Sequence, residues 1–279
     1  MSASRVVRSL GVALATVAAV TPRAGAQEPQ DPPIADNSFL IEEAYNQEPG
    51  VVQHISAFQL FRGADAWIYT FTQEWPLSGR TSQLSFTLPV QRTSDGPSAA
   101  TGLGDVALNY RYQLAGADRL SVAPRLSLLL PTGRSRADLG AGALGVQANV
   151  PLSLVVARTV IMHWNAGATV TPSAKNALGA EATTVGYNLG ASVVWLVRPS
   201  FNALLEVAWT RSETVAGSGA TTWSEGLMLS PGIRWAHNLS RGLQVVPGIA
   251  LPIAVGPSTG EDAVFLYLSF EHPFRSAQR

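Results

Sequence analysis

The sequence "AVFLYLSFEHPF" (residues 263–274) places an apolar residue at every second position close to the end of the chain. The apolar positions are Val264, Leu266, Leu268 and Phe270, and Phe274 keeps the same phase. Successive side chains of a β-strand point to opposite faces. The stretch therefore predicts a strand with one apolar face, which is followed by the tail "RSAQR" (residues 275–279).

The same period of two extends over the whole chain from residue 50. In "TSQLSFTLPV" (81–90), for example, Leu84 and Phe86 share one face while Gln83 and Ser85 share the other. Such a pattern is typical of strands of which one face contacts apolar surroundings and the other does not. It predicts twelve strands, at roughly 50–62, 66–76, 81–91, 103–114, 119–131, 141–156, 159–170, 184–198, 201–211, 223–237, 242–254 and 262–274.

The connections between these strands alternate in length. Short ones read "LSGR", "AGAD", "AR", "RPS" and "NLSR", and the long ones read "TSDGPSAATG", "PTGRSRADLG", "TPSAKNALGAEAT" and "SETVAGSGATT". The short "GAD" after the first strand is an exception. Short turns at one end and long loops at the other are typical of a transmembrane antiparallel up-and-down β-barrel of a bacterial outer membrane. An even number of strands places both ends of the barrel at the periplasmic, short-turn side.

Composition agrees with a barrel and disfavours a helical membrane protein. Charged residues make up 14% of the chain, below the roughly 25% of an ordinary soluble domain. The mean hydropathy is only +0.14, and after residue 26 no apolar run of about 18 residues occurs. The chain carries 19 basic and 19 acidic residues, so no strong positive field for nucleic acid is expected.

Residues 1–26 are predicted to be a signal peptide. Arg5 and Arg8 precede the apolar stretch "SLGVALATVAAV", and "AGA" at 24–26 provides a small-residue cleavage site. A buried N-terminal helix is the alternative. The chain has no cysteine, which excludes a lipoprotein anchor, disulfides and thiolate metal ligands. We expect an exported protein of the outer membrane of a diderm bacterium.

Residues 27–49 form a separate N-terminal segment on the periplasmic side, with six acidic and no basic residues. "DPP" at 31–33 favours an extended start. "NSFLIEEAYNQ" (37–47) could form a short helix capped by Asn37 or Ser38. Two interpretations stay open at this point, namely a segment docked at the barrel mouth and a loose tail.

The barrel, residues 50–274, needs its last strand to pair with its first, because the bilayer core cannot solvate an open edge. The final apolar stripe resembles the C-terminal assembly signal of outer-membrane proteins, which implies recognition by the barrel-assembly machinery through Phe270 and Phe274. The tail after Phe274 departs from that signal, which usually ends the chain. The alternative is the last strand of a soluble sandwich.

The face opposite the apolar stripe would line the interior. Its candidate lumen residues are Glu74, Asp105, Arg111, Arg125, His163, Glu206 and Arg234. With Glu271, four acidic and three basic groups nearly cancel, so we expect them to pair with each other in a narrow lumen. Asp105 has a second interpretation, because "GLGD" is also a turn-to-strand junction. Twelve strands lie between barrels filled by side chains and barrels with a water channel, so a narrow passage and a blocked lumen both remain possible.

No enzyme, metal or cofactor site is predicted. A lipid hydrolase would need a nucleophile within reach of a base such as His163, and the sequence alone assigns it no serine. The four histidines have no metal-ligand spacing, and no recognised phosphate-binding glycine loop is present.

Two stretches resemble the MetA-pathway of phenol degradation family: "GLGDVALNYRYQL" (102–114) and "APRLSLLLPTGR" (123–134). The stretch "NSFLIEEAYNQEPGVVQHI" (37–55) resembles the opening of barrels described as transporters. The resemblance implies an outer-membrane barrel associated with uptake of small, often hydrophobic or aromatic, compounds.

These observations predict an outer-membrane barrel that passively admits small solutes, with outer-membrane lipid as its surroundings. The alternatives are a closed structural or adhesive barrel acting through its loops, a barrel hydrolase using His163, and a secreted soluble β protein.

Overall fold

The computed structural model describes residues 34–35, 37–93, 99–117, 119–239 and 243–273. All of them belong to one compact unit, Asp31–Arg279. The predicted signal peptide, residues 27–33, Phe274 and the tail lie outside the described residues.

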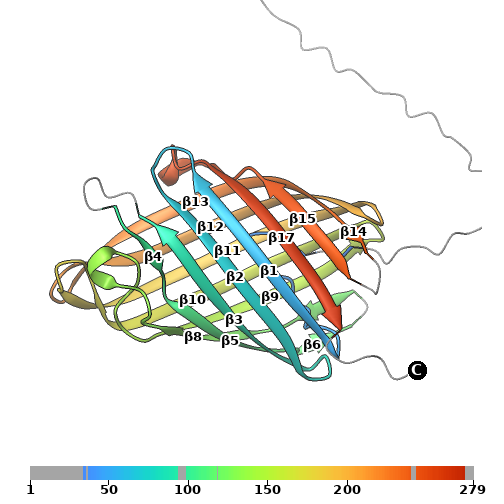
Figure 1. Ribbon diagram of the computed structural model, residues 1–279, viewed down its shortest axis with the longest axis horizontal. Helices are drawn as coiled ribbons and strands as arrows, with labels where there is room; N and C mark the ends of the chain where they lie inside the picture. The colour runs from blue at the N-terminus through green and yellow to red at the C-terminus, as the bar shows by residue number, and fades with distance from the viewer. Residues whose placement is uncertain (1–33, 36, 94–98, 118, 240–242, 274–279) are drawn as a thin grey trace, which may run out of the picture. The chain divides into compact units, whose positions relative to one another are not determined.

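The described residues form one antiparallel sheet that closes into a barrel of 12 strands (Figure 1). Irregular positions divide several of these strands, which gives 17 strand segments in total. The segments are β1 (Val51–Phe61), β2 (Trp67–Ser78), β3 (Ser82–Arg92), β4 (Thr101–Leu103), β5 (Val106–Tyr112), β6 (Ala115–Gly116), β7 (Leu120–Val122), β8 (Arg125–Leu130), β9 (Gly145–Ala157), β10 (Val160–Lys175), β11 (Glu181–Arg198), β12 (Phe201–Gly217), β13 (Ala220–Trp235), β14 (His237–Asn238), β15 (Gln244–Ala250), β16 (Ile253–Ala254) and β17 (Ala263–Pro273).

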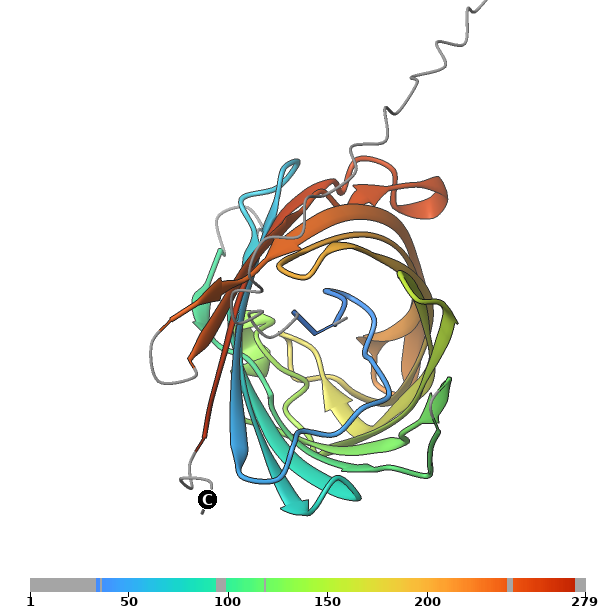
Figure 2. The same ribbon diagram turned by 90° about the vertical axis from the view of Figure 1, so that its right-hand side faces the viewer.

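The first and last strands close the barrel. β1 pairs with β17 along the length of both strands, from Val51 opposite Pro273 to Phe61 opposite Ala263. Figure 2 looks along the barrel and shows the closed wall. The predicted pairing of the apolar C-terminal strand with the first strand is therefore confirmed.

The two faces of the wall differ as the period of two predicted. On β5 and β8, the outward-facing Leu108 and Leu126 are 46% and 56% exposed. Their neighbours Asn109 and Ser127 are buried inside and are cross-strand partners. An apolar surface that faces outward and a polar interior are the arrangement that a barrel in a bilayer requires.

The two ends of the barrel differ in their connections. We call one end the short-turn end; its connections are 79–81, 117–119, 158–159, 199–200 and 239–243. We call the other the long-loop end; its connections are 62–66, 93–100, 131–144, 176–180, 218–219 and 255–262.

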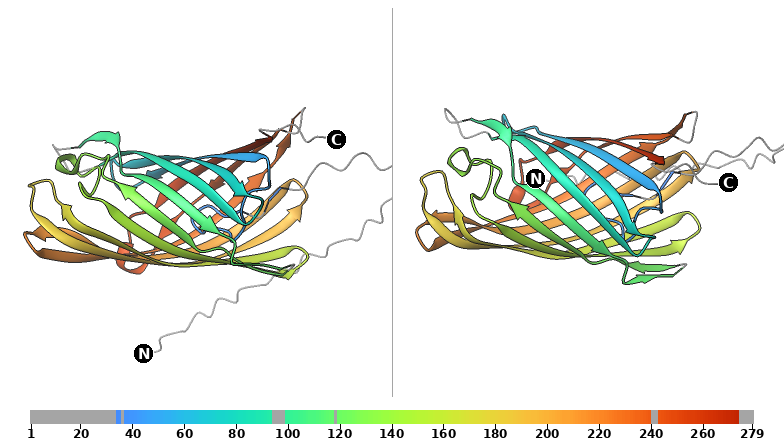
Figure 3. Two further views of the ribbon diagram at one scale, coloured as in Figure 1. Left: turned by 90° about the horizontal axis from the view of Figure 1, so that it is seen from below. Right: turned by 60° about the horizontal axis from the view of Figure 1, so that its bottom comes forward.

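The prediction of long loops at 171–183 and 212–222 was wrong, because most residues of both stretches belong to strands. β10 and β11 run on to a connection at 176–180, and β12 and β13 meet in a turn at 218–219 where Gly219 has φ +70°. Cross-strand side-chain bonds such as Thr214 to Thr222 support the extension, and glycine suits the left-handed turn. Figure 3 shows these yellow and orange strands reaching past their neighbours at the long-loop end.

Helical structure among the described residues is limited to short 3₁₀ turns such as η2 (Ser135–Ala137) and η4 (Gly256–Ser258). None of the described helices is long and apolar enough to cross a membrane. The short helix considered for residues 37–47 does not form, because most of the N–H groups there bond to the barrel wall instead of to each other.

Candidate luminal site

Residues 34–49, which we call the luminal segment, run inside the barrel (blue in Figure 2); residue 36 is not described. At the short-turn end, the Ile34 N–H donates to the Pro199 carbonyl at 2.7 Å. The segment then follows the inner wall and returns to the same end, where β1 begins at Val51. Ile41 and Ala44 are buried in the lumen, so the segment is docked inside and is not a loose tail.

Glu206 on β12 holds the middle of the luminal segment. One of its carboxylate oxygens, Oε1, accepts the N–H groups of three consecutive residues, Phe39, Leu40 and Ile41, at 3.0, 2.8 and 3.1 Å. The segment has no regular structure to satisfy these donors, and an unpaired buried N–H is costly. A side-chain oxygen of the wall therefore takes the place of a strand or helix partner.

Other wall side chains continue this pattern along the segment. Asn165 on β10 accepts the Glu42 N–H at 2.8 Å and donates to the Glu42 carbonyl at 2.9 Å. Further on, Ser153 Oγ accepts the Ala44 N–H at 2.8 Å. Further main-chain bonds come from Asn202 and Arg234 to Ala35, Arg234 to Asn37, Gln113 to Ala44 and Asn46, Arg111 to Tyr45 and Gln83 to Gln47.

Glycines of the inner face form sockets for two apolar side chains of the segment. A Cβ built on Gly232 or on Gly248 would lie 2.6 Å from the Phe39 ring. That ring packs against Phe265 and Tyr267, with centroids 5.4 and 5.2 Å apart. Only residues without a side chain leave room for the ring here.

Gly190 makes the second socket. A Cβ built on this residue of β11 would overlap Ile41 Cδ1 and would lie 3.2 Å from the Val207 carbonyl oxygen. The wall is thus shaped around Phe39 and Ile41 as well as bonded to the main chain.

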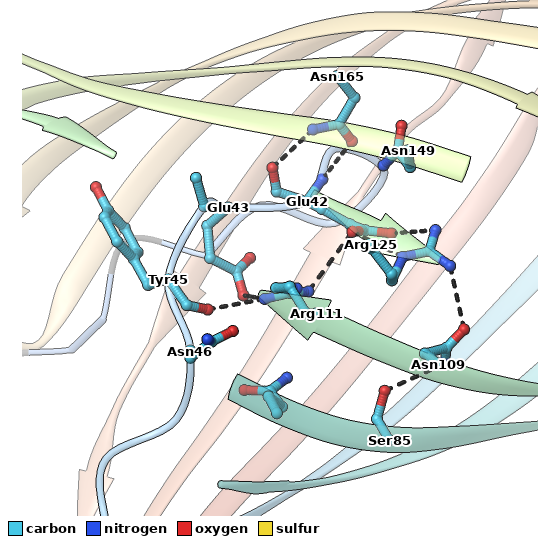
Figure 4. A network of polar contacts seen from close by, with 12 residues as sticks. Glu42, Glu43, Tyr45, Asn46, Ser85, Asn109, Arg111, Arg125, Asn149 and Asn165 are labelled. Carbon is cyan, nitrogen blue, oxygen red and sulfur yellow. Dashed lines mark hydrogen bonds and ion pairs between the residues drawn. The ribbon is translucent and has the colours of Figure 1, made fainter. Parts of the chain in front are cut away.

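A charged cluster lies where the segment faces β5 and β8 (Figure 4). Arg125 contacts Glu42 at 2.6 Å and also donates to Asn109. Arg111 lies 3.5 Å from Glu42 and 3.9 Å from Glu43. Burial opposes ionisation of Glu42, but the two guanidinium groups outweigh it and hold the pKa of this carboxyl below its ordinary value.

A cavity of about 340 Å³ lies beside the luminal segment. One part of its lining is apolar and includes Phe39, Ile55 and Tyr267. Another part is charged and polar and includes Arg125 and Gln147. The lumen is therefore narrowed but not filled, and the remaining space presents both kinds of surface.

The structure supplies a serine for His163, which the sequence alone did not. Ser153 on β9 lies opposite His163 on β10, with Oγ 2.7 Å from Nδ1. Both side chains are fully buried, and Ser153 Oγ also accepts the Ala44 N–H. The Ser153 hydroxyl therefore helps to hold the main chain of the segment. Because the side chain is fully buried, no substrate can reach it in this arrangement.

Asp105 directly precedes β5, at the long-loop end of the barrel. Its two carboxylate oxygens accept the N–H groups of Gly133 at 2.9 Å and Ala141 at 2.6 Å. Asp105 therefore fixes the connection 131–144 at the long-loop end, which agrees with the second, structural interpretation of "GLGD".

The other candidates have definite places. Arg111, Arg125, Glu206 and Arg234 all contact the luminal segment, and Glu74 is buried on the inner face and lines the cavity. Phe270 stacks on His54, with ring centroids 4.5 Å apart. Within the described residues, no group of three or more His, Cys, Asp or Glu side chains is arranged to hold a metal ion.

Sequence reasoning missed the residues that receive the segment. Gly190, Gly232 and Gly248 fall in the inward phase of their strands, where a glycine leaves space in the lumen. The pattern of the strands carries no information about which remote segment fills that space.

Comparison with known proteins identifies the fold. An outer membrane channel of Pseudomonas putida F1 superimposes with a TM-score of 0.61 over 82% of this chain and 97% of its own, at 15% identity. The NanC porin gives 0.50 over 78% and 98%, at 7% identity. The fold is that of outer-membrane channels.

Sequence comparison adds no family. No protein-family model matches the chain, and no curated protein matches it. The resemblance to the MetA-pathway family therefore remains a proposal that rests on residues 102–114 and 123–134.

Proposed function

We propose that this protein is a passive channel of the outer membrane that admits small molecules through a lumen narrowed by residues 34–49. The observation that carries the proposal is the cavity of about 340 Å³ beside the luminal segment, inside a closed barrel with an apolar exterior. A barrel built only as a scaffold gains nothing from a lined cavity.

The mixed lining supports solutes that combine an apolar body with a polar group. Phe39, Ile55 and Tyr267 offer apolar contact, while Arg125, Asn109 and Gln147 offer hydrogen bonds. The resemblance to the MetA-pathway family implies hydrophobic or aromatic solutes, and the apolar part of the lining is compatible with these.

Location follows from the same proposal. Residues 1–26 would direct export and be removed, and the stripe ending in Phe270 and Phe274 would be read by the barrel-assembly machinery. The outward leucines would face lipid, and the short-turn end would face the periplasm.

Conductance in a planar bilayer tests the proposal. We expect small current steps from the intact protein and larger steps from a variant lacking residues 27–49, provided that both show the heat-dependent gel shift of a folded barrel. Silence from both folded forms would contradict an open passage and leave the closed structural or adhesive barrel. Lipid hydrolysis by the intact protein that His163→Ala abolishes would point to the hydrolase.

A further inference from the structure

The inner wall binds the luminal segment chiefly through its main chain. Side chains from β3, β5, β9, β10, β12 and β13 bond to backbone groups between residues 35 and 47. Main-chain N–H and C=O groups are common to every peptide. We propose that the inner wall is a binding site for a peptide whose main chain bends around Glu206, and that residues 35 and 37–47 are its resident occupant.

The geometry at Glu206 and Asn165 defines what the site recognises. Glu206 requires three consecutive N–H donors, and Asn165 binds both the donor and the acceptor of one residue, as a neighbouring strand would. A chain with a proline or an N-methyl group at these positions lacks a required donor. The site therefore selects for an unsubstituted backbone.

Side chains add a short pattern to this recognition. The Gly232 and Gly248 socket takes an aromatic ring, and the Gly190 socket takes an aliphatic chain two residues later. Arg125 and Arg111 then receive a carboxylate in the position of Glu42. The ligand class is a peptide with a bent main chain that reads aromatic, any residue, aliphatic, acidic.

The connection to the barrel is not needed for these contacts. Glu48 and Pro49, between the segment and β1, are exposed. A cut at this point would leave every main-chain bond named above in place. The resident segment would then be a separate peptide held only by the wall.

The test uses the full chain with a protease site inserted between Pro49 and Gly50, cut only after folding. The resident segment is washed out in mild denaturant, the barrel is checked by its heat-dependent gel shift, and a labelled peptide of residues 34–48 is added. Binding is measured by fluorescence anisotropy. Three peptides are compared: the native peptide, one N-methylated at Leu40 and one N-methylated at Glu43, whose N–H has no hydrogen-bond partner among the described residues.

We expect saturable binding of the native peptide, a loss of roughly tenfold to a hundredfold on N-methylation at Leu40, and a much smaller change at Glu43. Alanine at every position except Phe39, Ile41 and Glu42 should retain most of the affinity. Failure of the folded, cut barrel to bind the native peptide would overturn the proposal, and so would equal binding of all three.

The proposal rests on the proposed function only where current is the readout. Peptide that blocks the current of the cut barrel supports both inferences. Binding without any current through any form would remove the channel and leave the peptide site, whereas current without binding would do the reverse.

Discussion

Single side chains of the barrel replace the backbone partners that the luminal segment lacks. Glu206 bonds three amides with one oxygen, and Asn165 pairs with both backbone groups of Glu42. Each of these residues is buried on the inner face, where water cannot substitute for a lost partner. The position of the segment is thus set residue by residue, and single changes should move it.

Glu42 makes the attachment of the segment sensitive to acid. Its lowered pKa means that the contact with Arg125 is fully present above the ordinary carboxyl pKa of about 4.3 and is lost as pH falls through the lowered pKa. We expect conductance to rise at acid pH. In Glu42→Gln the conductance at neutral pH should be higher than in the wild type. Its rise on acidification, which we call the acid step, should be smaller.

Glu48→Gln is the matched control for this experiment, because Glu48 lies on the same segment but pairs with Arg80 at an exposed position. Its acid step should equal that of the wild type. An unchanged step in Glu42→Gln would show that the contact between Glu42 and Arg125 does not control the acid response.

Gly190 tests the socket for Ile41. In Gly190→Ala the new methyl group overlaps Ile41 Cδ1, so we expect a displaced segment, a larger conductance and a stability loss of about 1–3 kcal/mol. Gly186→Ala lies on the same face of β11, where a Cβ meets Ser212 Cβ at an ordinary 3.6 Å. Equal conductance of the two variants would show that the socket does not position the segment.

The strands differ in how far they reach beyond the bilayer. β10 to β13 have 16, 18, 17 and 16 residues, whereas β1 to β3 have 11, 12 and 11. A transmembrane strand needs about 9–11 residues. The first group therefore forms a raised wall at the long-loop end, and only part of each of its strands can face lipid.

On β17, Leu268 tests the lipid-facing stripe. It is outward-facing and 42% exposed, so Leu268→Arg places a charge against the bilayer interior. We expect a loss of about 2–4 kcal/mol in the free energy of unfolding in lipid vesicles, measured by urea titration. Leu178→Arg, in the exposed connection 176–180, should change it little, and equal stability of both variants would refute the face assignment.

At the scale of the whole molecule, the barrel is one closed sheet whose interior is completed by a segment from outside the sheet. The wall supplies polar side chains, and the luminal segment supplies most of the main-chain groups that satisfy them. Without the segment, polar side chains of the inner wall would lose hydrogen-bond partners. Without the wall, the main chain of the segment would lose its partners. The cavity beside the luminal segment is the part of the lumen that this arrangement leaves unfilled.

Closure can be tested with a cross-link, because the chain has no cysteine of its own. Phe58 on β1 lies opposite Leu266 on β17. We expect Phe58→Cys/Leu266→Cys to form a disulfide on oxidation and to resist the heat-dependent gel shift. Phe58→Cys/Leu229→Cys places the second thiol on β13 and should not cross-link, and the opposite result would contradict the strand order.

The sequence predicted the wall far better than its contents. A period of two identifies strands and faces because it is a local property, and Leu108 and Asn109 needed no other information. The position of residues 37–47 depends on Glu206, Asn165 and the facing glycines, which lie more than a hundred residues away. The extended β12–β13 hairpin was missed because its serines, threonines and glycines are equally typical of a loop.

The path of the luminal segment has a consequence for the order in which the molecule is made. Residues 35–47 precede every strand that the structure describes, yet their partners extend from Gln83 on β3 to Arg234 on β13. They cannot settle until those strands stand side by side. The stretch synthesised ahead of the barrel is thus among the last to find its place, because its binding site exists only once strands from β3 to β13 have assembled.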